Sequence, residues 1–184
     1  MMTANKNNIL ITGLPGVGKT TLITKLAEGL KALDPAGFYT TEIRESGVRK
    51  GFELVSLDGR KGILSHVDIK SYARVGKYGV DIPGFEAFID NIDVLRPETG
   101  LIIIDEIGKM ECFSDKFKSL LREILDSDKP VVATIALKGE GIIADIKRRP
   151  DVTLFNVTAH NRESLLPEIT GLVRKLNSNT SQPQ

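Results

Sequence analysis

The chain has 184 residues, and its 25 lysine and arginine residues nearly balance its 24 aspartate and glutamate residues, which leaves a formal net charge of +1 at pH 7. This balance excludes a strong overall field that would draw the molecule to nucleic acid or to an anionic membrane. The single cysteine, Cys112, excludes an intramolecular disulfide framework and a cysteine-rich metal site, and it favours a cytoplasmic location. We therefore expect a cytoplasmic monomer with no membrane binding and no specific nucleic-acid binding.

The length suits one well-buried domain, and no linker-like stretch divides the chain. We predict a single domain over residues 1–176. The first eight residues are polar, and no window approaches the ~18 uninterrupted apolar residues of a membrane-spanning helix. Residues 177–184 (NSNTSQPQ) are small and polar, and we expect them to form a disordered tail.

Apolar strand segments alternate with helical patterns along the chain. Residues 9–12, 101–104, 131–137 and 152–157 are apolar runs typical of buried strands. Apolar side chains with helical spacing occur at Leu22, Ile23, Leu26, Ala27, Leu30 and Leu33; at Phe85, Phe88, Ile89, Ile92 and Leu95; at Phe117, Leu120, Leu121, Ile124 and Leu125; and at Leu165, Leu166, Ile169, Leu172, Val173 and Leu176. This alternation predicts an α/β fold whose mostly parallel central sheet has helices on both faces.

One region departs from the alternation. Residues 37–44, 51–57 and 61–67 have the composition of short strands, and Asp58-Gly59 is a typical hairpin turn. We predict a small antiparallel hairpin insertion over about residues 37–67, beside the main sheet.

The segment GLPGVGKT, residues 13–20, fits the pattern G-x-x-x-x-G-K-[ST] in full. Its glycines allow backbone amides to turn inward around phosphate oxygens, and the helix that follows adds its positive end. Lys19 is expected to contact the β- and γ-phosphates, and the Thr20 hydroxyl to coordinate Mg²⁺. The sequence therefore predicts a phosphate-binding loop that uses Mg²⁺ as its cofactor.

An acidic pair follows the second buried strand in LIIIDEIGKME, residues 101–111. In a parallel sheet the carboxyl end of this strand faces the same crevice as the phosphate loop. Asp105 is our candidate Mg²⁺ residue, and Glu106 is our candidate general base for an attacking water. Because side chains alternate along a strand, Glu106 must lie where the strand opens into a loop if both carboxylates are to face the site. Glu111 is the alternative base.

Arg44 is a third catalytic candidate. In FYTTEIR, Glu42 and Arg44 occupy alternate positions and so share one face of a strand. Arg44 would either stabilise charge on the γ-phosphoryl group or form an ion pair with a neighbouring side chain. Asn156 follows the last strand in NVTAHNR and is expected to flank the base, as are Thr158, Asn161 and Arg162, although helix capping by Asn161 explains that residue equally well.

The sequence resembles a known family. GLPGVGKTTL, GFYTTEIRESGVRKGFEL, ARVGKYGVD, LIIIDEIGKME and LFNVTAHNRESLLPEI occur in the order and spacing of the P-loop nucleoside-triphosphatases first described from thermophiles, also called cancer-related nucleoside triphosphatases. The resemblance runs from about residue 9 to residue 173. It implies a three-layer, RecA-like P-loop fold and Mg²⁺-dependent hydrolysis of ATP, GTP, CTP, UTP and TTP with little base preference.

The resemblance also implies two nucleotide-binding segments. To these we add Thr21, at the start of the helix, and Asn156. The predicted nucleotide-binding residues are Gly13, Leu14, Pro15, Gly16, Val17, Gly18, Lys19, Thr20, Thr21, Leu101, Ile102, Ile103, Ile104, Asp105, Glu106, Ile107, Gly108 and Asn156.

Three activities fit a phosphate loop. Hydrolysis of nucleoside triphosphates is favoured because a carboxylate directly after the metal aspartate suits the activation of water. A nucleotide or small-molecule kinase would use the same loop, with an acceptor near the insertion. A non-enzymatic nucleotide switch that recruits a partner is the third activity; a GTP-only switch is disfavoured because the sequence has no N-K-x-D element for reading guanine and the resemblance implies broad base tolerance.

Overall fold

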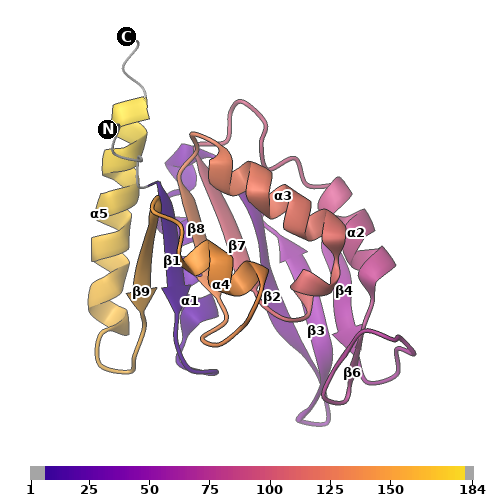
Figure 1. The fold of residues 1–184 in the computed structure, drawn as a ribbon. Coiled ribbons are helices and arrows are strands. Elements are labelled where there is room, and N and C mark those ends of the chain that lie inside the picture. The colour runs from indigo at the N-terminus through magenta and orange to yellow at the C-terminus, as the bar shows by residue number, and fades with distance from the viewer. Residues whose placement is uncertain (1–6, 181–184) are drawn as a thin grey trace.

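The computed structural model describes residues 7–180 and contains one nine-stranded sheet with the order β5-β6-β4-β3-β2-β7-β8-β1-β9 (Figure 1). The strands are β1 (Asn8–Thr12), β2 (Pro35–Glu45), β3 (Val48–Ser56), β4 (Lys61–His66), β5 (Arg74–Val75), β6 (Tyr78–Val80), β7 (Leu101–Ile107), β8 (Val131–Ile135) and β9 (Val152–Asn156). The α-helices are α1 (Lys19–Gly29), α2 (Ile82–Asp90), α3 (Asp115–Asp126), α4 (Ile142–Lys147) and α5 (Arg162–Thr180), and the 3-10 helices are η1 (Lys31–Leu33) and η2 (Glu111–Phe113).

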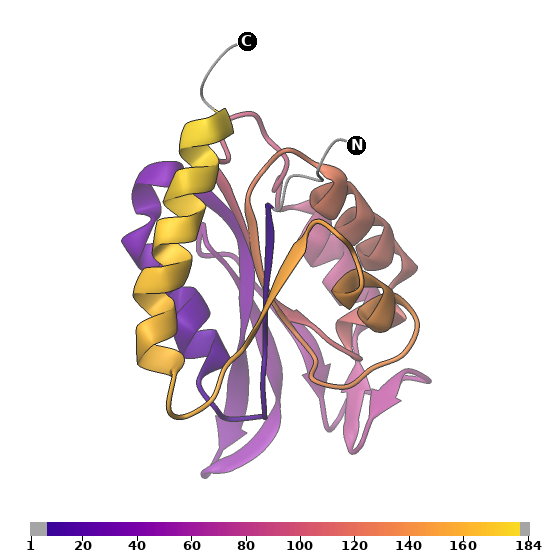
Figure 2. The same cartoon turned by 60° about the vertical axis from the view of Figure 1, so that its left-hand side comes forward.

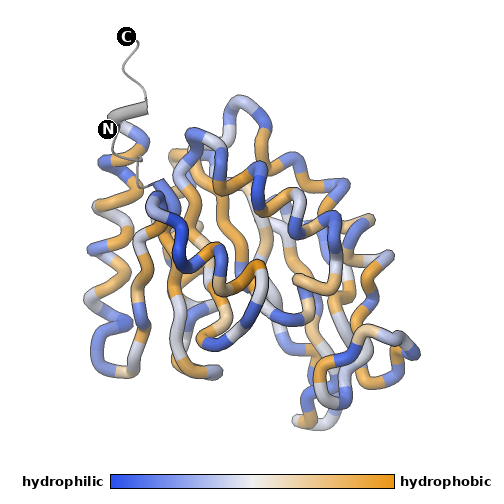
Figure 3. Tube along the Cα trace, viewed as in Figure 1, coloured by the Kyte–Doolittle hydropathy of each residue, from blue (hydrophilic) through white to orange (hydrophobic). Residues whose placement is uncertain are grey.

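Helices cover both faces of the sheet. Figure 2 shows α1 and α5 on one face and α2, α3 and α4 on the other. Because successive strand residues point to opposite faces, β7 contributes to both cores: Leu101 and Ile103 pack with α1 and α5, whereas Ile102 and Ile104 pack with the opposite helices. Hydrophobic residues follow the central strands in Figure 3. The predicted three-layer α/β fold is confirmed.

The parallel half of the sheet defines where a site can form. β1 pairs in parallel with β8 and β9, and β7 pairs in parallel with β2 and β8. The carboxyl ends of β1, β7, β8 and β9 therefore meet at one edge of the sheet, which we call the carboxyl edge. Crevices at this edge are the usual ligand sites of parallel α/β sheets.

The antiparallel region is larger than the sequence predicts. β2 pairs in parallel with β7 and antiparallel with β3, so the region continues the main sheet instead of lying beside it. It also includes β5 and β6, which extend it to Val80. The β2–β3 hairpin projects beyond the carboxyl edge, at the bottom of Figure 1.

The C-terminal helix is longer than expected. The tail predicted for residues 177–184 is wrong for residues 177–180, which form the end of α5. α5 continues because Ile169 and Val173 are buried against the sheet and the Asn177 side chain donates a hydrogen bond to the Gly100 carbonyl at 2.7 Å. Residues 181–184 lie outside the described residues.

Within residues 7–180, none of the helices has both the length and the apolar character needed to cross a membrane.

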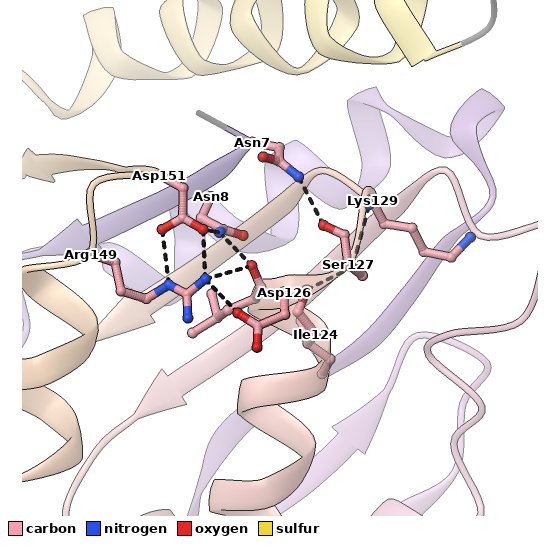
Figure 4. A network of polar contacts seen from close by, with 9 residues as sticks. Asn7, Asn8, Ile124, Asp126, Ser127, Lys129, Arg149 and Asp151 are labelled. Carbon is pink, nitrogen blue, oxygen red and sulfur yellow. Dashed lines mark hydrogen bonds and ion pairs between the residues drawn. The ribbon is translucent and has the colours of Figure 1, made fainter. Parts of the chain in front are cut away.

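A polar network ties three elements together at the opposite, amino edge of the sheet (Figure 4). The Arg149 guanidinium contacts the carboxylates of Asp151 at 2.6 Å and of Asp126 at 2.7 Å. It also donates to the Leu125 carbonyl, which accepts a second hydrogen bond from the Asn8 side chain. The hydrogen bonds from Arg149 are the main reason why the pKa of Asp151 is lowered. We call these five residues the amino-edge network.

Candidate active site

The phosphate loop connects β1 to α1 at the carboxyl edge. Gly18 is the residue before the helix and has φ 103°, a left-handed conformation that favours glycine. Since Gly18 has no side chain to cap the helix, the first amides of α1 have no capping side chain and are available to a ligand. Those amides and the helix dipole are the groups that the sequence analysis expects to bind phosphate, and that role stays a prediction.

Gly13 fixes the loop against β9. A Cβ atom at this position would lie 2.6 Å from the Val157 carbonyl oxygen and 2.8 Å from its Cγ1, distances that real side chains do not adopt. The Val157 amide also donates to the Thr12 carbonyl at 2.7 Å. The start of the loop is therefore held by Val157, the residue that follows β9.

Lys19 reaches back across the loop that it follows. Its ammonium donates to the carbonyl oxygens of Gly13 at 3.2 Å and Leu14 at 3.3 Å. The positive charge thus lies at the mouth of the loop, where the β- and γ-phosphates are expected.

Asp105 joins the two predicted nucleotide-binding segments. Its Oδ2 accepts a hydrogen bond of 2.6 Å from the Thr20 hydroxyl, and its Oδ1 accepts one from the Thr134 hydroxyl. The Asp105 side chain is almost fully buried, and burial raises its pKa, whereas hydrogen bonds from Thr134, Thr20 and the Thr40 amide and the Lys19 charge oppose that rise. The structure brings together the two residues predicted to bind metal.

Thr134 is a site residue that the sequence analysis missed. It lies in β8, where every neighbour is apolar, and its side chain is completely buried. The signal was present in the segment VVATI, because a lone hydroxyl in a fully buried strand needs a hydrogen-bond partner. That partner is Asp105, on the adjacent strand.

Glu106 lies within β7, where a register shift breaks the pairing with β8. Ile104 pairs with Ala133, and the next paired residue is Ile107, opposite Ile135. The predicted opening into a loop is thus a local irregularity of a strand that continues to Ile107. Burial raises the pKa of the half-buried Glu106 carboxyl; the nearby Lys19 charge lowers it and the Asp105 charge raises it further.

Glu111 points into the protein beside Gly108. Its Oε2 accepts a hydrogen bond from the Gly108 amide at 3.1 Å. Burial raises the pKa of Glu111 to about 8, with further increases from the charges of Glu106 and Asp105. Glu111 therefore keeps its proton at neutral pH.

Arg44 is engaged within its own hairpin. It shares a strand face with Glu42, as predicted, and the two form an ion pair at 2.6 Å, while Arg44 also donates to the Gly47 carbonyl. The pairing of β2 with β7 ends at Phe38 and Ile104, so Arg44 lies ~20 Å further along an extended strand. The structure does not bring Arg44 to the phosphate loop, and its catalytic role stays a prediction.

The end of β9 lies beside the phosphate loop. Asn156 is in register with Thr12 of β1, and its carbonyl accepts a hydrogen bond from the Asn161 side chain. Asn161 Oδ1 also accepts from the Thr158 amide at 2.7 Å. Asn161 thus stabilises the turn before α5. Asn156 and Arg162 lie near the loop, and their contact with a base stays a prediction.

Comparisons with known proteins agree with this geometry. Residues 8–170 match the NTPase family. The chain is 48% identical over 167 residues to the nucleoside-triphosphatase THEP1 of Thermotoga sp. (strain RQ2), an alignment that covers 90% of this chain and 95% of the relative.

Two solved structures are similar. The crystal structure of THEP1 from the hyperthermophile Aquifex aeolicus superposes with a TM-score of 0.81 at 39% identity and covers 90% of this chain and 98% of its own. The solution structure of a human cancer-related nucleoside triphosphatase gives a TM-score of 0.78 at 39% identity and covers 96% of this chain and 100% of its own. The phosphate loop, the acidic strand end and these matches over most of the chain show that the protein belongs to the NTPase family.

Proposed function

We propose that the protein hydrolyses nucleoside 5′-triphosphates to diphosphate and phosphate, with Mg²⁺ as cofactor and with broad base tolerance. The observation that carries the proposal is the 2.6 Å contact between the Thr20 hydroxyl and the Asp105 carboxylate. It joins the phosphate loop to the acidic end of β7 in one site. The names of the relatives as nucleoside-triphosphatases support hydrolysis over phosphoryl transfer to an acceptor.

The donor set suits Mg²⁺. Thr20 and Asp105 offer a hydroxyl and a carboxylate oxygen, which are hard ligands, and Mg²⁺ commonly takes one or two protein oxygens together with waters and substrate phosphates. Within the described part of the chain, no group of three or more histidine, cysteine or acidic side chains forms an all-protein metal cage. When bound, Mg²⁺ would neutralise negative charge on the β- and γ-phosphate oxygens.

The chain's own groups divide the remaining work. The loop amides and the first turn of α1 bind the phosphates, and Lys19 adds positive charge at the loop mouth. Glu106 orients a water and accepts its proton as the water oxygen bonds to the γ-phosphorus. The bond from the γ-phosphorus to the bridging oxygen breaks, and the diphosphate leaves with that oxygen.

Glu106 suits the base role better than Glu111. A base must be ionised when water attacks, and Glu111, with a pKa of about 8, is protonated at neutral pH. The Glu111 side chain is also buried, and it accepts a hydrogen bond from the Gly108 amide. Glu106 is half-buried and lies next to Asp105. We assign the base to Glu106 and a loop-positioning role to Glu111.

The test is phosphate release from ATP, GTP, CTP and UTP, with Mg²⁺ or with a chelator. Glu106→Gln should lower turnover roughly 10²- to 10⁴-fold while nucleotide binding persists. Glu98→Gln, an exposed glutamate outside the site, is the matched control and should retain full activity. Undiminished turnover by the Glu106 variant would remove Glu106 from the mechanism. Undiminished turnover in chelator would remove Mg²⁺.

A further inference from the structure

A cavity of about 320 Å³ opens between α1 and α5, directly beside the phosphate loop. Gly18, Thr21 and Leu22 line it from the loop and α1, and Arg162 and Leu166 line it from α5. Its volume is at the lower end of the range for small-molecule sites. No residue assigned above to catalysis or metal binding lines this cavity.

The order of the strands places the cavity at the nucleoside end of a bound triphosphate. Asp105 and Glu106 lie on β7, whereas β9 and α5 lie on the other side of β1, from which the phosphate loop leaves. The γ-phosphate must face Asp105 and Glu106 for the proposed reaction. The phosphate chain therefore runs from the β7 side toward β9 and α5, and the nucleoside emerges next to the cavity.

Arg162 is one of three charged residues that line this cavity, together with Lys25 and Glu163. A Cβ atom built on Gly18 would lie 3.7 Å from both Cδ and Nη1 of Arg162, so the guanidinium lies beside the phosphate loop. Among the described residues, the Arg162 side chain has no hydrogen bond or ion pair. A guanidinium plane free of partners can stack on the face of any base.

The turn that precedes α5 holds Arg162 in place. The Arg162 amide donates to the Thr158 carbonyl at 3.2 Å, and Asn161 bonds to both Thr158 and Asn156. The Val157 amide in turn donates a hydrogen bond to the carbonyl of Thr12, at the end of β1. The backbone of Arg162 is thus fixed relative to the phosphate loop by a short chain of hydrogen bonds.

The lining provides a surface on which a base can stack. Leu22 and Leu166 supply apolar surface beside the Arg162 guanidinium, and the polar side chains of Thr21, Lys25 and Glu163 complete the lining. Resting on the hydrolase function proposed above, we propose that this cavity binds the nucleoside and that Arg162 stacks on the base without selecting it. Because every base has a face on which it can stack, a stacking contact of this kind tolerates all the bases.

The experiment measures affinity by calorimetry, so that it does not depend on turnover. The probes are non-hydrolysable analogues of ATP and CTP, and inorganic tripolyphosphate, which has the phosphate chain without a nucleoside, each with Mg²⁺. Arg162→Ala should lower the affinity for both analogues roughly tenfold, and its affinity for tripolyphosphate should stay within about twofold of the wild-type value. Arg162→Lys should lower the affinity for the analogues almost as much, because lysine keeps the positive charge but lacks the planar guanidinium group. Arg174→Ala, an exposed arginine on the same helix, is the control.

Four results would overturn the inference: unchanged analogue affinity in Arg162→Ala, an equal loss for tripolyphosphate, full rescue by lysine, or a loss confined to one base. The second and third would mean that Arg162 acts as a charge on the phosphates. Binding without phosphate release by the wild-type protein would instead contradict the proposed function while leaving the cavity assignment standing.

Discussion

Thr134 sets the position of the carboxylate on which the proposed metal site depends. The Thr134 hydroxyl donates a hydrogen bond to one carboxylate oxygen of Asp105, and the Thr20 hydroxyl donates a hydrogen bond to the other. We expect Thr134→Val, which removes the hydroxyl with little change in shape, to raise the Mg²⁺ concentration for half-maximal phosphate release by ~10-fold or more, as losses behind metal ligands typically do. A titration of activity with Mg²⁺ measures the effect. Thr134→Ser keeps the hydroxyl and should restore most of the affinity; equal curves for the valine variant and wild type would show that Asp105 needs no such support.

Glu111 makes stability depend on pH. Its folded pKa of about 8 lies above the ~4.3 of an unfolded glutamate, so the folded state binds the extra proton between these values. The free energy of unfolding therefore decreases as pH rises through that window, by at most ~1.4 kcal/mol per pH unit from this group. Glu111→Gln has no proton to lose, and it should lose less stability than wild type between pH 5 and pH 8.5 in urea unfolding with chelator.

The comparison for Glu111 is Glu98→Gln, which alters an exposed glutamate. Its stability should follow that of wild type across the same pH range. If the Glu111 and Glu98 variants changed in parallel with pH, Glu111 would not hold a proton in the folded protein.

At the scale of elements, contact between the phosphate loop and the end of β9 limits what residue 13 can be. Gly13→Ala would force a Cβ atom against the Val157 backbone, which cannot move without shifting β9 or the loop. We expect the free energy of unfolding to fall by ~1–3 kcal/mol and nucleotide affinity to fall with it. Urea unfolding and calorimetric binding of a non-hydrolysable analogue measure the two effects.

Gly29 offers the same substitution at the other end of α1. A Cβ atom there would meet nothing within 4 Å. Gly29→Ala should leave nucleotide affinity unchanged and keep or raise stability, by up to ~1 kcal/mol, because alanine favours helix. Equal losses in both variants would mean that the contact with Val157 is not the cause.

Elements with a strong apolar pattern were predictable from the sequence, and elements held by tertiary contacts were not. β1 and β7 follow from continuous apolar runs, but β5 and β6 have two and three residues, too few to show a period. The last turn of α5 has a polar sequence and forms because Asn177 binds Gly100 across the sheet edge. In the site, the loop motif and Asp105 were found, whereas Thr134 depends on a neighbour 29 residues away in the chain.

At the scale of the molecule, the two edges of the sheet have different tasks. At the carboxyl edge, the Lys19 ammonium and the Glu106 carboxyl form no ion pair with any described side chain, which leaves both groups available to a ligand. At the amino edge, the cation Arg149 is matched by Asp151 and Asp126. Charged groups held ready for a ligand do not stabilise the fold, so we expect the amino-edge network to contribute more to stability than the active site does.

Substitution of Arg149 tests whether the amino-edge network stabilises the fold without affecting the active site. Arg149→Ala removes contacts that link the end of α3 to the segment before β9, and it leaves Asp151, whose side chain is 17% exposed, without its cation. We expect a loss of ~1–3 kcal/mol in the free energy of unfolding at pH 7, with nucleotide binding unchanged. Because the folded pKa of Asp151 is lowered, the stability from this pair is present above the unfolded aspartate pKa of ~3.9 and is lost as pH falls through the folded value. The difference between wild type and variant should therefore shrink below about pH 4.

The neighbouring arginine separates this network from general surface charge. Arg148 pairs with Asp145 one turn away, and its side chain is 74% exposed. An exposed pair of this kind contributes little, so Arg148→Ala should cost at most ~0.5 kcal/mol and show no comparable dependence on pH. Urea unfolding of the three proteins at pH 7 and pH 3.5 decides the matter. Two results would contradict this prediction: an equal loss of unfolding free energy in the two variants, or a loss in the Arg149 variant that is as large at pH 3.5 as at pH 7. Either would show that charge pairing in the amino-edge network does not stabilise the fold.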